Sequence, residues 1–268
     1  MKFNKNSKGY VEYLRNIQKE KKKVLLYQIL ILIGFIFCWE ILANFKIINV
    51  FLFSKPSQIY RLFVTYLLSG ELGINVAISV YETVLGLIIG TVFGIIIAIG
   101  LWWSKKLSKI LDPFLVVLNA LPKTALAPII IVWIGAGVKG IIFTSISISI
   151  VVTILSAYNY FISVDEDKVK MLQTFGATKW QIFWKLILPA NTINLINLTK
   201  INIGMSWVGV IVAEFLVSRY GIGYMIVYGS QVFKLDLVMM GVFVLAICAW
   251  IMYEIVNLLE KYYSKKRY

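Results

Sequence analysis

The sequence predicts an all-α, polytopic membrane protein with six transmembrane helices. Hydrophobic residues make up 60% of the 268 positions, and the mean hydropathy is +0.82. Both values are too high for an ordinary soluble domain. In addition, apolar runs of roughly 20 residues, long enough to cross about 30 Å of hydrocarbon, recur along the chain. These observations together exclude a soluble globular fold.

The six predicted spans are separated by short polar segments. In chain order they are Val24–Ala43, Val76–Leu101, Phe114–Ile134, Gly140–Phe161, Ile193–Val217 and Leu237–Leu258. The third and the fifth contain one lysine each, and Pro122 and Pro128 indicate a broken helix within the third. The spans define a transmembrane domain at 24–258, with a cytoplasmic insertion at 163–189.

Lysine and arginine are unequally divided between the two sets of connecting segments. Nineteen lie in the tails and in two of the loops, and six lie in the remaining loops. Because positive charge accumulates on the cytoplasmic side, we expect a multi-pass protein of the cell (inner) membrane with both termini in the cytoplasm. The net charge of +14 reflects this asymmetry and attraction to anionic lipid, rather than a nucleic-acid partner.

Basic tails flank the transmembrane domain at 1–23 and 259–268. The first is either a surface-lying amphipathic helix, with Tyr10, Leu14 and Ile17 at helical spacing, or a solvated segment. The first apolar run lacks a small-residue cleavage site and is expected to remain as an anchor.

The residues that catalysis usually needs are missing. The chain has no histidine and no G-x-x-x-x-G-K-[ST], H-E-x-x-H or G-x-S-x-G motif. Cys38 and Cys248 lie singly in apolar runs, which argues against a disulfide or a zinc site. We therefore predict that the chain is not an enzyme, with no catalytic residue, bound metal or cofactor. Uphill transport would then need an ion gradient or a partner.

Residues 163–189 form a polar stretch between apolar runs. We expect a short helix at its start. Ser163 and Glu166 have the spacing of a capping box, and acidic residues follow where a helix N-terminus favours them. Gly176 can end this helix in the left-handed conformation.

A second short helix is expected after Gly176. Thr178 and Gln181 form a second capping box, and Leu188-Pro189 is expected to end the helix, because a residue before proline resists helical geometry. The helix contains the aromatic residues Trp180, Phe183 and Trp184. Two capped helices joined at a glycine indicate a docking element.

Known sequences show a similar arrangement. Gly176-Ala177, the hydrophobic Phe183 and Leu188-Pro189 have the spacing of the "EAA" loop of bacterial ABC importer permeases, which reads E-A-A-x-x-x-G followed by L-P. This segment therefore resembles that loop, which is common to ABC importers in general.

Four further stretches extend the resemblance over roughly residues 50–225 and are similar to the nitrate/sulfonate/taurine-type permeases. They match that family's first periplasmic segment, second-helix entry, third helix, and fifth helix with the following loop. The stretches are Ser54–Ser57 (SKPS), Ser79–Gly86 (SVYETVLG), Leu121–Gly137 (LPKTALAP ending in WIGAG) and Trp207–Tyr224 (WVG, AEF and GIGY).

The resemblance implies a type I ABC importer permease fold and a defined set of partners. Two copies of the chain would pair, and each would contact one cytoplasmic ATP-binding subunit that holds ATP and Mg. An extracellular or periplasmic binding protein would deliver the solute. The residues expected to couple the chain to the ATPase are Lys170, Met171, Leu172, Phe175, Gly176, Ala177, Thr178, Trp180, Phe183, Leu188 and Pro189.

Two departures and one alternative qualify the match. Lys170-Met171-Leu172 replaces the family's glutamate-alanine-alanine, which suggests an acidic or neutral partner surface. Glu82 stands where many relatives have arginine. Interfacial lipid anchoring is an alternative role for the aromatic residues after Thr178.

Polar residues inside the spans suggest a translocation pathway, because burying them in a bilayer is costly. The resemblance and the broken third span together indicate Lys123, Thr124, Ser206, Trp207 and Glu214. Lys123 could attract an anion, or it could snorkel or pair with Glu82 or Glu214. Lys200 is expected to snorkel. Asn194, Asn197 and Asn202 either line a polar path or bond neighbouring helices.

Gly86, Gly90 and Gly94 form a small-residue ridge that favours close helix packing within the domain over a dimer interface.

The function expected from the resemblance is the permease subunit of an ATP-driven, binding-protein-dependent importer of a small anion such as a sulfonate, taurine or nitrate. A vitamin-precursor importer (thiamine pyrimidine or riboflavin) is an alternative. An ion-coupled secondary transporter and a membrane scaffold are further alternatives. A secondary transporter would be expected to contain inverted repeats, and no internal repeat is evident.

Overall fold

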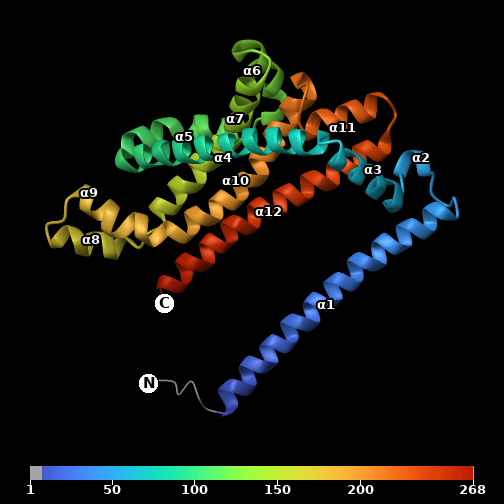
Figure 1. Ribbon diagram of the computed structural model, residues 1–268. Coiled ribbons are helices and arrows are strands. Elements are labelled where there is room, and N and C mark those ends of the chain that lie inside the picture. The colour runs from blue at the N-terminus through green and yellow to red at the C-terminus, as the bar shows by residue number, and fades with distance from the viewer. Residues whose placement is uncertain (1–7, 268) are drawn as a thin grey trace. The chain divides into compact units, whose positions relative to one another are not determined.

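The computed structural model describes residues 8–267, with side chains for 15–17 and 19–265, and within that range it contains no strand. The chain divides into two units, 1–62 and 63–268, which are described separately (Figure 1). The elements are α1 (Lys8–Asn44), α2 (Val50–Phe53), α3 (Pro56–Leu68), α4 (Glu71–Trp103), α5 (Lys105–Ala120), η1 (Lys123–Leu126), α6 (Ala127–Ile134), α7 (Val138–Ile162), α8 (Glu166–Thr174), α9 (Lys179–Ile182), η2 (Phe183–Ile187), α10 (Leu188–Val217), α11 (Ile222–Gln231) and α12 (Leu235–Arg267).

The first unit consists of α1, α2 and the start of α3. Helix α1 begins at Lys8 and continues unbroken through the first predicted span; residues 1–7 of the N-terminal tail lie outside the described residues. Beyond α1, Asn49 caps α2 by accepting from the Phe51 N–H at 2.9 Å. The Glu40 carboxylate near the end of α1 accepts from Ser57 at the start of α3, at 3.0 Å from the backbone N–H and 2.8 Å from the hydroxyl. These bonds fold the start of α3 back onto the end of α1.

The centre of the second unit is the close packing of α4 against α7. A Cβ added to Gly90 would lie 2.5 Å from Ser149 Oγ, and one added to Gly94 would lie 2.6 Å from Thr153 Cβ. Neither distance is sterically possible, so glycine is required for the observed helix separation. The ridge that begins at Gly86 therefore packs within the domain, as predicted.

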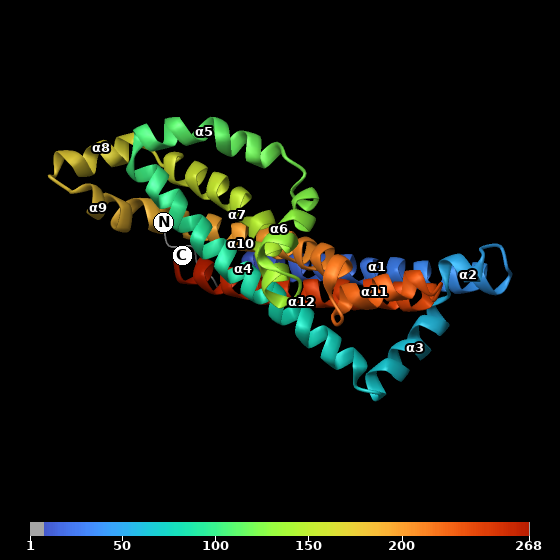
Figure 2. The same cartoon turned by 90° about the horizontal axis from the view of Figure 1, so that it is seen from above.

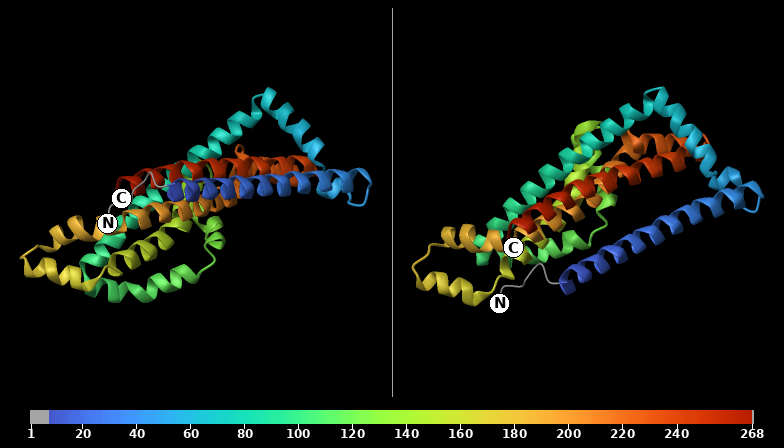
Figure 3. Two further views of the ribbon diagram at one scale, coloured as in Figure 1. Left: turned by 90° about the horizontal axis from the view of Figure 1, so that it is seen from below. Right: turned by 60° about the horizontal axis from the view of Figure 1, so that its bottom comes forward.

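The third predicted span is not a single helix. Helix α5 ends at Ala120, and the pair formed by α5 with η1–α6 is bent by 89° (Figure 3). Leu121 is extended at φ −66° and ψ 140°, as a residue before proline prefers. The span therefore runs from Lys105 to Ile134 as a bent pair, longer than the predicted Phe114–Ile134.

The remaining core is formed by α10 with α4, α7, α11 and α12. In the first half of α10, Lys200 forms an ion pair with Glu260 of α12, donates to Asn257 Oδ1 at 3.0 Å and lies 5.2 Å from the Tyr253 ring centroid. Helix α12 thus supplies a partner for the charge of Lys200, and the snorkelling of its side chain to the interface stays a prediction. In the described part of the chain, five helices can cross a membrane, or six spans with the bent pair. The chain is thus an all-α polytopic membrane protein.

Candidate functional site

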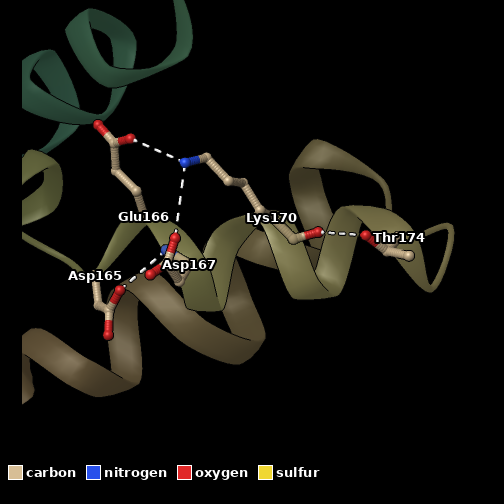
Figure 4. Close-up of polar contacts among 5 residues, drawn as sticks. All are labelled: Asp165, Glu166, Asp167, Lys170 and Thr174. Carbon is tan, nitrogen blue, oxygen red and sulfur yellow. Dashed lines mark hydrogen bonds and ion pairs between the residues drawn. The ribbon is translucent and has the colours of Figure 1, made fainter.

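Helix α8 opens the polar segment and is capped differently from the prediction. Its N-cap is Asp165, whose Oδ1 accepts from the Asp167 N–H at 2.9 Å (Figure 4). Ser163 instead donates to the Tyr160 carbonyl at 2.9 Å, at the end of α7. The predicted Ser163–Glu166 capping box is therefore wrong, because a carboxylate two residues later lies closer to the free N–H groups of the first turn.

Lys170, which replaces the glutamate of the EAA pattern, is held by its own helix. Its Nζ lies 3.6 Å from Glu166 Oε2 and 3.7 Å from Asp167 Oδ1 (Figure 4). Both pairs have the (i, i+3) or (i, i+4) spacing that places side chains on one helix face. All three side chains are well exposed, so these pairs contribute little stability. Their effect is to balance the positive charge of Lys170 within α8.

The turn between α8 and α9 matches the prediction. Gly176 has φ +75°, the left-handed conformation that glycine adopts without steric cost. The Gly176 N–H donates to the Gln173 carbonyl at 2.9 Å, and the Ala177 N–H donates to the Leu172 carbonyl at 3.0 Å. These bonds satisfy carbonyl groups at the end of α8 and fix the direction in which the chain leaves it.

Thr178 then starts α9 with a complete capping box. Its hydroxyl accepts from the Gln181 N–H at 3.3 Å, and its own N–H donates to Gln181 Oε1 at 2.8 Å. The two short helices lie side by side at one end of the second unit (Figures 1 and 2). Glycine and cap together make the α8–α9 segment (residues 166–187) a fixed turn.

Phe183 anchors the α8–α9 segment in the core. It is 1% exposed, and its ring centroid lies 5.5 Å from that of Phe161 on α7 and 5.2 Å from that of Trp102 on α4. Ile182 and Ile187 are buried in the same cluster, and Leu172 and Ala177 pack against it. The base of the segment is therefore continuous with the ends of α4 and α7.

Other side chains of the same segment point outward. Phe175 is 79% exposed, Trp180 57% and Met171 52%. Trp180 stacks edge-on against Trp103 and Trp184, at centroid distances of 5.9 and 5.4 Å. A rigid, buried base thus presents an apolar outer face, which here means Met171, Phe175 and Trp180.

Leu188 and Pro189 do not end a helix. The chain stays helical from Lys179 to Val217, with the wide π turn η2 at Phe183–Ile187 followed directly by α10. Pro189 occupies the first turn of α10, where the missing N–H of proline is tolerated. The predicted termination is wrong, because the π turn absorbs the proline that would otherwise clash with the preceding turn.

The five predicted pathway residues are not brought together in this chain. Lys123 and Thr124 lie in η1 at the bend of the third span. Lys123 Nζ donates to the Asn119 carbonyl at 3.1 Å and to Asn119 Oδ1 at 3.2 Å. Its suggested pairing with Glu82 or Glu214 is therefore wrong.

Ser206 and Trp207, in contrast, are buried in α10 at 0% and 4% exposure. Within the described part of the chain, Ser206 Oγ and Trp207 Nε1 have no hydrogen-bond partner. One turn away, Asn202 Nδ2 donates to Thr153 Oγ1 at 2.8 Å and to Thr91 Oγ1 at 2.9 Å. Asn202 therefore bonds neighbouring helices, one of the two predicted alternatives.

Glu214 joins α10 to α4 and to the loop before α11. It is 1% exposed, and its carboxylate accepts from Ser79 Oγ and from the Gly223 N–H, each at 2.5 Å. Asn75 Oδ1 accepts from the Gly221 N–H at 2.6 Å. The carboxyl group of Glu82 on α4, also 1% exposed, lies beside Glu214, and its Oε2 has no hydrogen-bond partner among the described residues. Sequence reasoning missed Asn75 and the role of Ser79.

Residues 90–267 match the family model described as the binding-protein-dependent transport system inner membrane component. The chain belongs to this family. Its members are permease subunits of ATP-driven importers and are not themselves enzymes, and the chain is therefore an ABC importer permease of the membrane.

Among curated proteins, the chain is 29% identical over 230 residues to the aliphatic sulfonates transport permease protein SsuC of Bacillus subtilis (strain 168), covering 85% of this permease and 83% of SsuC. It is 24% identical to the taurine transport system permease protein TauC of Escherichia coli (strain K12), with 80% of each covered. It is 26% identical to the formylaminopyrimidine transport permease protein ThiX of Halalkalibacterium halodurans, over 52% of this chain and 56% of ThiX.

The fold of this permease is similar to that of a solved ABC importer. Inward-facing structures of the MetNI methionine ABC transporter superpose with a TM-score of 0.59 at 17% identity, covering 68% of this chain and 93% of theirs. A second crystal form of the same transporter superposes with a TM-score of 0.58 at 16% identity, covering 74% of this chain and 96% of that one. The type I importer permease fold is therefore shared.

Proposed function

We propose that this permease works as a homodimer with two cytoplasmic ATP-binding subunits and an external solute-binding protein, and that the α8–α9 segment is its contact with the ATPase. The observation that carries the proposal is the outward apolar face on a buried base. Phe175 and Trp180 stay exposed, although the segment that carries them is fixed at Gly176, Thr178 and Phe183.

A rigid element of this kind is suited to transmitting motion. Movement of an ATPase subunit that grips Phe175 and Trp180 would pass through Phe183 to α4 and α7, because the Phe183 ring contacts Trp102 and Phe161 directly. A flexible loop would absorb the same movement. Lys170 is balanced by Glu166 and Asp167, so we infer that the partner surface is apolar rather than a basic patch. Leu188 and Pro189 would contribute by joining η2 to α10.

For the pathway, we propose that Lys123 and Thr124 line the route and that Ser206, Trp207 and Glu214 support it from behind. Lys123 is half-buried and Thr124 is exposed at the bend of the third span. The other three side chains are buried between α10 and its neighbours, where they fix the position of the helix.

We infer a small anion of the sulfonate, taurine or nitrate type as the solute. The printed names of SsuC and TauC, which align over most of the chain, support this class, as does the cationic Lys123. A vitamin precursor is the second candidate, because the ThiX permease also aligns, over about half of the chain.

The orientation is also part of the proposal. Lys105, Lys109 and the α8–α9 segment would face the cytoplasm together with both termini, as the excess of basic residues on that side indicates.

The docking role is tested by the double variant Phe175→Ala/Trp180→Ala, purified from its native membrane through a tag. We expect normal membrane insertion and thermal stability, since both side chains are exposed, and loss of the co-purifying ATP-binding subunit. The matched control is Trp250→Ala, which removes a tryptophan that is 64% exposed on α12. Retention of the ATP-binding subunit by the double variant would overturn the docking role.

A further inference from the structure

A cavity lies against the α8–α9 segment, and the three residues of its apolar outer face do not line it. Its volume is about 580 Å³, and it is lined by the ends of α4 and α7, the start of α5, and α8, α9 and η2. These elements gather at the same end of the second unit in Figures 1 and 2. The volume is within the range of small-molecule sites, roughly 300–1,000 Å³.

The depth of the cavity is indicated by two of the spans that contribute to it. Leu101 and Trp102 are among the last residues of the span that ends at Trp103, and Phe161 and Ile162 are the last of the span that ends at Ile162. The ends of these spans therefore indicate that the cavity lies at the level where hydrocarbon gives way to headgroups. Tyr158 lines it as well, with its hydroxyl accepting from Ser108 Oγ at 2.5 Å, and aromatic side chains favour this depth.

The lining of the cavity has two chemical parts. Trp102 and Ile162 provide an apolar floor, with the buried Phe161, Ile182 and Ile187 beneath them. The charged part of the lining consists of four lysines, which are Lys105, Lys109, Lys170 and Lys179. Glu166 is the one carboxylate among the residues that line the cavity. The combination matches an amphiphile whose charged end is negative.

Two of these lysines have no counter-charge among the residues that the structure describes. Lys170 is paired with Glu166 and Asp167, and Lys179 donates to the Trp103 carbonyl and lies 5.3 Å from the Trp102 ring centroid. Lys105 and Lys109 stand one turn apart on α5, exposed, and neither forms an ion pair with any described residue.

We propose that this cavity binds an anionic phospholipid, with the phosphate between Lys105 and Lys109 and the upper part of an acyl chain against Trp102 and Ile162. A free phosphate would leave the apolar floor unused, and a zwitterionic lipid would bring a second cation next to the two ammonium groups, which they repel. The bound lipid would thus join the start of α5 to the ends of α4 and α7, on which the α8–α9 segment packs.

The test uses the purified full chain in a neutral detergent, with lipid binding followed by native mass spectrometry during titration. The probes are phosphatidylglycerol, phosphatidylcholine and inorganic phosphate. Near an anionic surface each lysine contributes roughly fivefold to affinity. We therefore expect Lys105→Gln/Lys109→Gln to weaken phosphatidylglycerol binding about 25-fold. This readout does not depend on transport or on an ATPase subunit, so it stands or fails separately from the proposed function.

The matched control is Lys19→Gln/Lys23→Gln, which removes two exposed lysines at the same spacing from α1. It should bind phosphatidylglycerol like the unaltered protein. Both double variants change exposed side chains and should keep their melting temperature. Equal affinity for phosphatidylcholine, equal weakening by the control, or competition by inorganic phosphate at the lipid's own concentration would each overturn the proposal.

Discussion

Gly209 offers the sharpest test of the packing in this structure. A Cβ at this position of α10 would lie 2.5 Å from the Cα of Ser145 and 3.1 Å from its backbone nitrogen. Carbon atoms in contact are normally about 3.5–4.0 Å apart, so α10 and α7 would have to separate by roughly 1 Å. The Ser145 hydroxyl also donates to the Ser206 carbonyl at 3.2 Å across this contact, and that bond would be strained as well.

These contacts set the expected change in the free energy of unfolding. Overpacking costs about 1–3 kcal/mol, and a clash with backbone, which cannot rotate away, belongs at the upper end. Alanine regains about 1 kcal/mol of helix propensity over glycine. The net free energy of unfolding should therefore fall by about 2 kcal/mol for Gly209→Ala, which corresponds to a melting temperature lower by about 4–8 °C.

Gly204 is the matched control on the same helix, because a Cβ there would meet nothing within 4 Å. We expect Gly204→Ala to keep or slightly raise the melting temperature. Thermal unfolding in a mild detergent, followed by tryptophan fluorescence, compares the two variants. If Gly209→Ala melts at the same temperature as Gly204→Ala, the described contact between α10 and α7 is wrong.

Three further predictions concern separate contacts. Gly176→Val should leave insertion intact and abolish transport-coupled ATPase activity of the assembled importer, because a β-branched residue is strained at φ +75°; unchanged stimulation by solute would contradict this. Phe183→Ala should lower the free energy of unfolding by about 3–5 kcal/mol, whereas Trp180→Ala, with its exposed side chain, should change it little, as thermal unfolding can measure. Lys200→Met and Glu260→Gln should each destabilise the chain, and a double-mutant cycle should show a coupling of about 1 kcal/mol or more, since the pair is partly buried; strict additivity would argue against the ion pair.

Local signals were readable from the sequence where one residue decides the conformation. Gly176 and the Thr178–Gln181 box were predicted and are present, because left-handed glycine and reciprocal capping depend only on neighbours in the chain. The Ser163 cap failed for a related reason, as Asp165 competes for the same first-turn N–H groups. Pro189 was misinterpreted because a π turn, which has no clear sequence signal, precedes it.

Contacts between distant residues could not be predicted in this way. Glu82 and Glu214 were identified as unusual, but their contact depends on how α4 packs against α10, which periodicity does not specify. The same holds for Lys200, whose partner Glu260 lies on another helix. The sequence also did not distinguish Phe183, which is buried against Phe161 and Trp102, from its exposed neighbours Trp180 and Trp184.

The subunit composition of the native assembly tests the central claim most directly. Native mass spectrometry of the tagged protein, extracted gently from its own membrane, should give a complex of two copies of this chain with two ATP-binding subunits. That complex should dissociate to the permease alone when Phe175 and Trp180 are replaced by alanine. A chain that is recovered without any ATP-binding subunit, and that still moves solute in vesicles without ATP, would contradict the account.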